Sequence, residues 1–213
     1  MLLSLNSSLN ANIAVAKRKK LTFTSTMKDE VSDEQLMLQY AKGDAVAFEI
    51  LYERHRGGLY RYCLRQLGNA ARAEECFQEV WMKLINSRVN YQPKALFTTY
   101  LYRIAHNHVI DIVRKDKKIK QETELDEAID YASSDQGSAD LVNELSKQAL
   151  EDNLRQQIHA LPLEQKTALL LKLDGGLSLE EIANVLNCGR ETIKSRLRYA
   201  MAKLRACLEN EHE

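Results

Sequence analysis

Two histidines, an asparagine and an aspartate lie close together in the stretch FTTYLYRIAHNHVIDIVRKDKK, residues 97–118. With this spacing, His106, Asn107, His108 and Asp111 could form a metal-assisted nuclease site. They could equally belong to a helix that contacts nucleic acid without cutting it. The two hypotheses make different demands on the local geometry, because a metal ion needs its ligands on one face.

The stretch has the pattern of an amphipathic helix. It contains no glycine or proline, and its apolar residues recur at steps of three and four. These residues are Leu101, Ile104, Ala105, Val109 and Ile112. His106 and His108 then point to nearly opposite faces, whereas zinc sites on helices use histidines four residues apart. The geometry therefore disfavours the nuclease hypothesis.

One flank of this predicted helix is polar and basic. It carries Thr99, Arg103, His106, Asn107 and Arg114, followed by Lys115, Lys117, Lys118 and Lys120. A charged run of this kind is usually a solvated face. Its combination with aromatic residues at Tyr91, Phe97, Tyr100 and Tyr102 makes contact with nucleic acid an equal alternative.

The composition predicts an all-α protein. The 213 residues are 45% hydrophobic, and only two prolines and eight glycines interrupt the chain. The pattern predicts helices over 32–42, 44–67, 70–87 and 95–117, and then over 140–160, 163–174, 178–187 and 189–209. No apolar run approaches the length of a membrane span, so we expect no membrane insertion. The four scattered cysteines indicate reduced thiols in a cytoplasmic protein, either in helix cores or at the surface, and not a metal site.

The net charge of zero hides opposed blocks. Residues 91–120 contain seven basic residues (lysine or arginine) and two acidic ones (aspartate or glutamate). Residues 121–152 contain one basic and ten acidic residues, and residues 187–205 contain six basic residues and one acidic residue. Two basic blocks flanking an acidic one suit DNA contacts at two separate places. The acidic block has few large apolar residues, so it is predicted to be a flexible linker between two small helical domains.

The predicted boundaries follow from that linker. The first domain covers 28–118, the linker 119–140 and the second domain 141–213. Residues 1–27 place their basic cluster after the apolar residues, unlike a secretory signal. They are predicted to be either a disordered arm or an extension upstream of a natural start at Met27.

A helix-turn-helix is predicted near the C-terminus. Ser178 and Glu181 have the spacing of a capping box at the start of a short apolar helix. A tight turn at 187–189 leads into a second, basic helix, the kind that enters the major groove. Its outward residues are Lys194, Ser195, Arg198 and Arg205, with Arg190, Glu191 and Tyr199 at the margins. The alternative is an ordinary amphipathic surface helix.

Four motifs in order resemble the extracytoplasmic-function group of bacterial sigma-70 factors, from about Asp33 to Leu208 outside the linker. The first, GDAVAFEILYERHRGGLYRYCLRQLGN, resembles the opening helices of region two, and AEECFQEVWMKLI resembles the polymerase-binding helix. FTTYLYRIAHNHVIDIVRK is similar to the promoter-melting helix, with Tyr100 where tryptophan is usual. LPLEQKTALLLKLDGGLSLEEIANVLNCGRETIKSRLRYAMAKLR resembles region four.

The resemblance implies a sigma factor that makes and breaks no bond and needs no cofactor or metal. The second helix of the helix-turn-helix would bind the minus-thirty-five element through Arg190, Glu191, Lys194, Ser195, Arg198 and Tyr199. Region two would bind and melt the minus-ten element through Asn90, Tyr91, Tyr100, Arg103, Asn107 and Arg114. Within these sets, Asn90 and Tyr91 would capture a flipped-out base. His108 falls on the apolar side and is expected to be packed or interfacial.

The resemblance also implies protein partners. Glu75, Gln78, Glu79 and Met82 would contact the clamp of the largest polymerase subunit, while Trp81 is expected in the core. The polymerase flap, promoter DNA and an anti-sigma factor are the other implied partners.

Three rival classes fit less well. A response regulator needs a parallel-sheet receiver domain, a free-standing regulator binds DNA without polymerase, and an enzyme needs a convergent reactive cluster. A free-standing helix-turn-helix regulator is the strongest of these alternatives.

Overall fold

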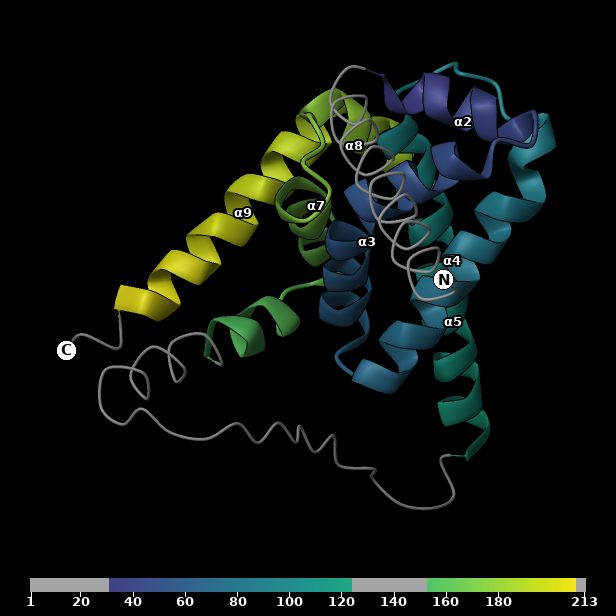
Figure 1. Cartoon of the computed structure of the whole chain (residues 1–213). Helices are drawn as coiled ribbons and strands as arrows, with labels where there is room; N and C mark the ends of the chain where they lie inside the picture. Colours follow the sequence, from purple (N-terminus) through teal and green to yellow (C-terminus); the bar gives the residue numbers. More distant parts are fainter. Residues whose placement is uncertain (1–30, 124–152, 210–213) are drawn as a thin grey trace, which may run out of the picture. The chain divides into compact units, whose positions relative to one another are not determined.

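We describe a computed structural model of the chain over residues 31–123 and 153–209. These residues form α-helices and one 3-10 turn, with no strand among them, as the composition predicts (Figure 1). The chain divides into two compact units, Met1–Arg54 and His55–Glu213, and the boundary falls inside helix α3. The predicted extension at 1–27 and most of the predicted linker lie outside the described residues.

In the first unit, α2 (Asp33–Ala41) leads into α3 (Ala45–Leu67) through a short turn. Ser32 caps α2 by accepting a hydrogen bond from the Gln35 amide, and Asp44 accepts from the Val46 amide at 2.9 Å. Gly43 supplies the positive φ of 101° that the turn requires. Leu36, Met37, Ala47, Ile50 and Leu51 are the buried apolar residues here.

The second unit contains the predicted DNA-binding helices. The rest of α3 is followed by α4 (Ala70–Ser87), the turn η1 (Arg88–Asn90) and α5 (Phe97–Thr123). Asn69 caps α4 by accepting from the Arg72 amide at 3.0 Å. Helix α5 extends to Thr123, beyond the predicted end at 117, because residues 118–123 contain no helix breaker and continue the helix.

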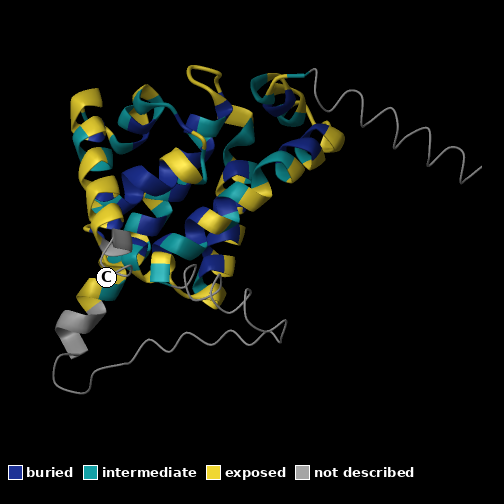
Figure 2. Ribbon diagram, turned by 90° about the vertical axis from the view of Figure 1, so that its left-hand side faces the viewer, coloured by how far each residue is buried: buried dark blue, intermediate teal, exposed yellow. Residues whose placement is uncertain are grey.

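The C-terminal part of this unit is also helical. Residues 153–159 are helical and are followed by α7 (Leu163–Leu173), α8 (Leu179–Leu186) and α9 (Arg190–Glu209). α8 packs against both α9 and α5. Figure 2 shows the buried residues on the inner sides of the helices and the exposed ones on the outer sides. The largest fully buried side chains in this unit include Tyr62, Leu84, Phe97, Leu101, Leu170, Ile182 and Ile193.

Candidate nucleic-acid interface

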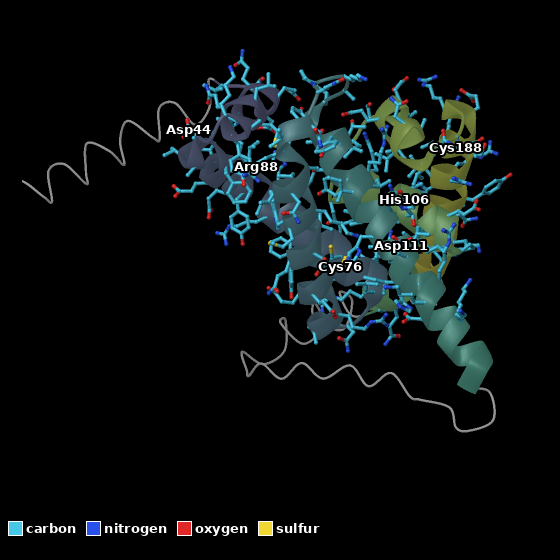
Figure 3. The ribbon with its side chains drawn as sticks, turned by 90° about the vertical axis from the view of Figure 1, so that its right-hand side faces the viewer. Asp44, Cys76, Arg88, His106, Asp111 and Cys188 are labelled. Atoms are coloured by element: carbon cyan, nitrogen blue, oxygen red, sulfur yellow. The ribbon has the colours of Figure 1, made fainter. Side chains whose placement is uncertain are left out.

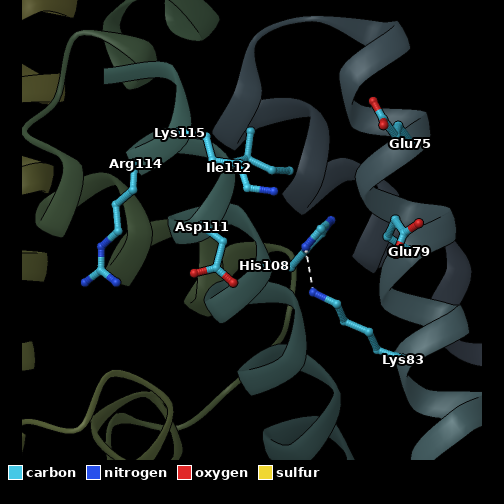
Figure 4. A pocket seen from close by; sticks show the side chains of 8 residues that line it. All are labelled: Glu75, Glu79, Lys83, His108, Asp111, Ile112, Arg114 and Lys115. Atoms are coloured by element: carbon cyan, nitrogen blue, oxygen red, sulfur yellow. Dashed lines mark hydrogen bonds between the residues drawn. The ribbon is translucent and has the colours of Figure 1, made fainter. Parts of the chain in front are cut away.

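The two histidines that opened the nuclease question lie in different surroundings on α5. His106 is half-buried against the C-terminal elements, and burial lowers its pKa below the ordinary value. His108 lies in a groove between α4 and α5, where its Nδ1 is 2.8 Å from Lys83 Nζ (Figure 4). Burial and the Lys83 ammonium both lower the pKa of His108. The two rings therefore do not converge on one ion.

The described residues hold no group of three or more metal-ligating side chains in reach of one ion. Figure 3 places Cys76 far from Cys188, so these thiols do not form one site. Cys63 and Cys76 are fully buried among the helices, and Cys188 is half-buried. Cys63 and Cys76 therefore occupy core positions, which is one of the two predicted alternatives, whereas Cys188 is only partly buried.

The loop before α5 presents a mixed surface. Asn90 is exposed, whereas only 7% of Tyr91 is exposed, and its ring packs against those of Phe97 and Tyr100 at centroid distances of 6.5 and 5.1 Å. The Tyr100 hydroxyl lies 2.7 Å from Ser87 Oγ, which fixes the ring at the end of α4. In this conformation the exposed Asn90 side chain is open to contact with a base. The Tyr91 ring, which was also predicted to capture a base, is instead packed under the loop against Phe97 and Tyr100.

Two exposed apolar side chains in this loop were not among the predicted site residues. Val89 is 72% exposed and Leu96 is 55% exposed, on either side of the Asn90–Tyr91 pair. Their sequence signal is an apolar residue that falls outside any helical repeat. Because bases have apolar faces, such residues can line a pocket for an unstacked base.

The polar flank of α5 is only partly open to solvent. Asn107 and Arg114 are exposed and lie at a pocket that also contains residues of α7, α8 and α9. Arg103 is exposed, but its Nη2 donates to the Asn184 carbonyl of α8 at 3.0 Å. Thr99, on the same flank, is 1% exposed and donates to Glu181 Oε1 at 3.2 Å. α8 therefore covers the N-terminal part of the flank.

The outer face of α4 gathers the residues predicted to contact polymerase. Glu75, Gln78, Glu79 and Met82 are all exposed, and Met82 is 50% exposed although it is apolar. Trp81 is only 4% exposed, which confirms its predicted place in the core. An exposed methionine beside carboxylates gives this face both an apolar contact and charge, as a protein-docking surface requires.

The predicted helix-turn-helix forms from local signals. Ser178 and Glu181 make the capping box reciprocally, with the Ser178 amide donating to Glu181 Oε2 at 2.8 Å and the Glu181 amide donating to Ser178 Oγ at 3.2 Å. Asn187 ends α8 at φ 49°, a left-handed conformation that asparagine tolerates better than most residues. These two ends set the turn into α9.

The basic face of α9 points away from its packed side. Ile193, Ala200 and Leu204 are buried, while Arg190, Glu191, Lys194, Arg198 and Tyr199 are exposed and Ser195 is half-buried. Arg190 pairs with Glu180 of α8, and Lys194 lies 3.7 Å from Glu191. The Arg198 guanidinium lies over the Tyr199 ring at 5.1 Å. The face is therefore cationic, and its ion pairs are exposed to solvent, where such pairs contribute little stability and DNA phosphates can replace them.

No described helix combines the length and the hydropathy that crossing a bilayer demands.

Together, the described surfaces comprise a basic helix face suited to a groove, a polar and aromatic face suited to single-stranded bases, and a separate face suited to a protein.

Comparison with known proteins gives two family matches, Sigma-70 region 2 over residues 51–119 and Sigma-70, region 4 over residues 158–206. The chain is 30% identical to the ECF RNA polymerase sigma factor SigW of Bacillus subtilis, over 85% of this chain and 99% of that protein. It is 28% identical to the ECF RNA polymerase sigma-E factor of Escherichia coli, over 80% and 91%.

Solved structures share the fold. CnrH, solved in complex with the cytosolic domain of CnrY, superposes with a TM-score of 0.63 at 20% identity, covering 84% of this chain and 99% of that one. The sigma factor RpoE of Bartonella quintana, solved with the anti-sigma factor NepR, gives 0.61 at 21% identity, covering 76% and 96%.

Proposed function

Since this chain belongs to the extracytoplasmic-function group of the sigma-70 family, we propose that its three surfaces divide the work of an alternative sigma factor. The outer face of α4 binds the clamp of core RNA polymerase, α9 binds the minus-thirty-five element, and α5 with its preceding loop binds and melts the minus-ten element. The polymerase performs all bond chemistry, and the sigma factor acts in the cytoplasm without a cofactor.

The observation that carries the proposal is the difference between the two DNA faces. On α9, Lys194 and Arg198 are exposed cations on a rigid helix, which can reach base edges and phosphates in a major groove. Near α5, Asn90 and Asn107 offer amide hydrogen bonds beside aromatic rings, which suits bases that have left the duplex. Flipping costs a few kcal/mol, and stacking returns about 1–3 kcal/mol per base.

Run-off transcription with core polymerase tests the sigma activity directly. With a promoter selected by the wild-type holoenzyme, we expect a transcript that core polymerase alone does not give. A free-standing regulator would give none, and that result would reject the proposal.

Single substitutions test the division between the two DNA faces. Arg198→Ala should weaken duplex promoter binding by about 1–3 kcal/mol if the side chain reads a base. Lys203→Ala is the matched control, since Lys203 is an exposed cation of α9 that is not among the residues assigned to DNA. Asn107→Ala should leave duplex binding intact and reduce opening, and a template with a pre-melted bubble should restore its transcript. Equal rescue of Arg198→Ala by the bubble would contradict this division.

We also propose control by an anti-sigma factor. The two solved relatives are bound to CnrY and NepR respectively, the latter described as an anti-sigma factor, which supports this kind of partner here. Purification of the native chain from unstressed cells should recover a small co-purifying protein. Recovery of only the free or polymerase-bound chain would argue against such control.

A further inference from the structure

Lys83 of α4 reaches across to α5 instead of back along its own helix. Its Nζ lies 2.8 Å from Nδ1 of His108, and Figure 4 shows the lysine side chain extending across the groove between the two helices. Because a lysine ammonium only donates hydrogen bonds, the imidazole nitrogen is the acceptor. A neutral ring that accepts at Nδ1 carries its proton on Nε2, so the contact also fixes the tautomer of His108.

Glu79 lies one helical turn before Lys83. A glutamate and a lysine four residues further on are neighbours on a helix, and this order is the favourable one. Contact over the same spacing does occur on α4, where Gln78 Nε2 donates to Glu74 Oε1 at 2.9 Å. Among the residues that the structure describes, Glu79 nevertheless forms no ion pair with a lysine or an arginine. His108 therefore holds the ammonium that would otherwise pair with Glu79.

The carboxylate of Glu79 is left open on the face assigned to the polymerase. Its other neighbours at three and four residues along α4 are Glu75, Cys76 and Met82, so Lys83 is the only cation of α4 that can pair with it along the helix. Glu79 and Met82 are both exposed. An exposed carboxylate without a cation beside it is available to a basic group of a partner protein.

We propose that His108 is a positioning residue for polymerase binding: by holding Lys83 across the groove, it leaves the Glu79 carboxylate open to a basic side chain of the polymerase clamp. The inference rests on the proposed role of the outer face of α4. It gives His108 and Lys83 a part in docking, although neither is among the residues predicted to contact polymerase. Without the acceptor on α5, Lys83 turns back to Glu79 and competes with the polymerase for it.

The size of the effect follows from the strength of an exposed ion pair on one helix. Such a pair forms in about two thirds of the molecules, so about one third present a free carboxylate. Since the polymerase binds the unpaired third, its affinity should fall about threefold when Lys83 is released to Glu79.

Two substitutions of His108 differ in the property that matters. His108→Gln keeps a hydrogen-bond acceptor for Lys83, whereas His108→Leu has a side chain of similar size without one. His108 is half-buried at the groove, so both full chains should fold. Competition with a fluorescently labelled wild-type chain for core RNA polymerase measures the affinity of each variant. His108→Leu should bind about threefold more weakly than the wild type, and His108→Gln should match it.

Substitutions on α4 show whether His108 acts through Lys83 and Glu79. Lys83→Met removes the competing ammonium, so adding His108→Leu to it should cost no further affinity. Glu79→Gln should weaken binding by itself, and His108→Leu should again add nothing. A threefold loss from His108→Leu that persists in the Lys83→Met chain would overturn the inference.

Nitrogen NMR of the free chain with isotope-labelled histidine tests the pairing without polymerase. The neutral His108 ring should be protonated at Nε2, and His108→Gln identifies its signals by removing them. Because the Lys83 ammonium lowers the pKa of His108, Lys83→Met should raise that pKa. A neutral ring protonated at Nδ1, or a pKa of His108 that Lys83→Met does not change, would overturn the inference whatever the polymerase assays give.

Polymerase binding should also depend on pH. Burial, Lys83 and Lys115 lower the pKa of His108, while Glu79 and Asp111 act in the opposite direction, and the pKa lies below the ordinary 6.5. The protonated ring cannot accept at Nδ1, so Lys83 is released as the pH falls through the lowered value. Binding by the wild-type chain should therefore weaken below pH 6.5 more than binding by His108→Gln. Identical pH profiles of the two chains would contradict the inference.

Failure of the inference can be told apart from failure of the proposed function. If Glu79→Gln binds core polymerase as the wild type does, Glu79 is not a polymerase contact, and both its assignment and the inference are wrong. If Glu79→Gln weakens binding while His108→Leu leaves it unchanged, the inference alone is wrong.

Discussion

Glu181 joins a local feature and a distant one, and we expect its replacement to affect both. One carboxylate oxygen accepts from the Ser178 amide and completes the capping box, while the other accepts from Thr99 of α5. Glu181→Ala should therefore weaken the start of α8 and its contact with α5 together. Ser178→Ala should remove part of the cap, and Thr99→Val should remove only the bond to α5.

The kind of interaction that each substitution removes sets the expected loss of stability. Loss of a helix cap costs about 1 kcal/mol, and loss of a hydrogen bond to a charged group costs about 1.5–3 kcal/mol. Glu181→Ala should then destabilise α8 by about 3 kcal/mol, against about 1 kcal/mol for Ser178→Ala. Native-state hydrogen exchange at the Ile182 and Val185 amides measures these free energies locally, without requiring the whole chain to unfold in one step.

A double-mutant cycle separates the two bonds. Thr99→Val should have almost no further effect in a Glu181→Ala background, because its partner has already gone. Thr99→Val and Ser178→Ala should add to within about 0.5 kcal/mol, since they remove different bonds. If Thr99→Val costs as much with Glu181→Ala as without it, the hydrogen bond does not couple α5 to α8 and the reasoning fails.

The same carboxylate predicts a dependence on pH. Burial by itself raises the pKa of Glu181, but the hydrogen bonds from Ser178 and Thr99 outweigh it and hold the pKa below its usual 4.5. A lowered pKa means that the folded state favours the charged form. The stabilisation is therefore complete above pH 4.5 and is lost as the pH falls through the lowered value. Glu181→Gln should abolish this part of the acid dependence measured by hydrogen exchange.

Three further expectations follow from burial and backbone geometry. Burial lowers the pKa of His106, so its contribution to the free energy of unfolding should be complete above pH 6.5. That contribution should be lost below pH 6.5, because the unfolded chain takes up a proton there more readily than the folded chain. His106→Gln should flatten this part of the pH dependence of the melting temperature. Asn187→Ala should destabilise the helix-turn-helix by about 1 kcal/mol in chemical denaturation because of the left-handed backbone, whereas Asn187→Gly should not. Trp81→Ala should cost about 3–5 kcal/mol of stability, while the exposed Met82→Ala should stay within about 0.5 kcal/mol and instead weaken pull-down of core polymerase; equal losses of stability would contradict their assigned places.

The sequence by itself determined the helices and the faces they present. Ser178 and Glu181 fix where α8 starts, and the three- and four-residue steps of apolar side chains decide which side of α9 is buried. These are interactions between near neighbours, so their pattern is written directly into the order of residues. The same helical geometry excluded a shared metal ion between His106 and His108.

Tertiary structure alone decided which of these faces are covered. Tyr91 looks like a loop residue in the sequence, but packing against Phe97 and Tyr100 buries it. The bond from Thr99 to Glu181 spans 82 residues, and the one from Arg65 to Asp174 spans 109. No periodicity links residues so far apart, because their meeting depends on how whole helices pack.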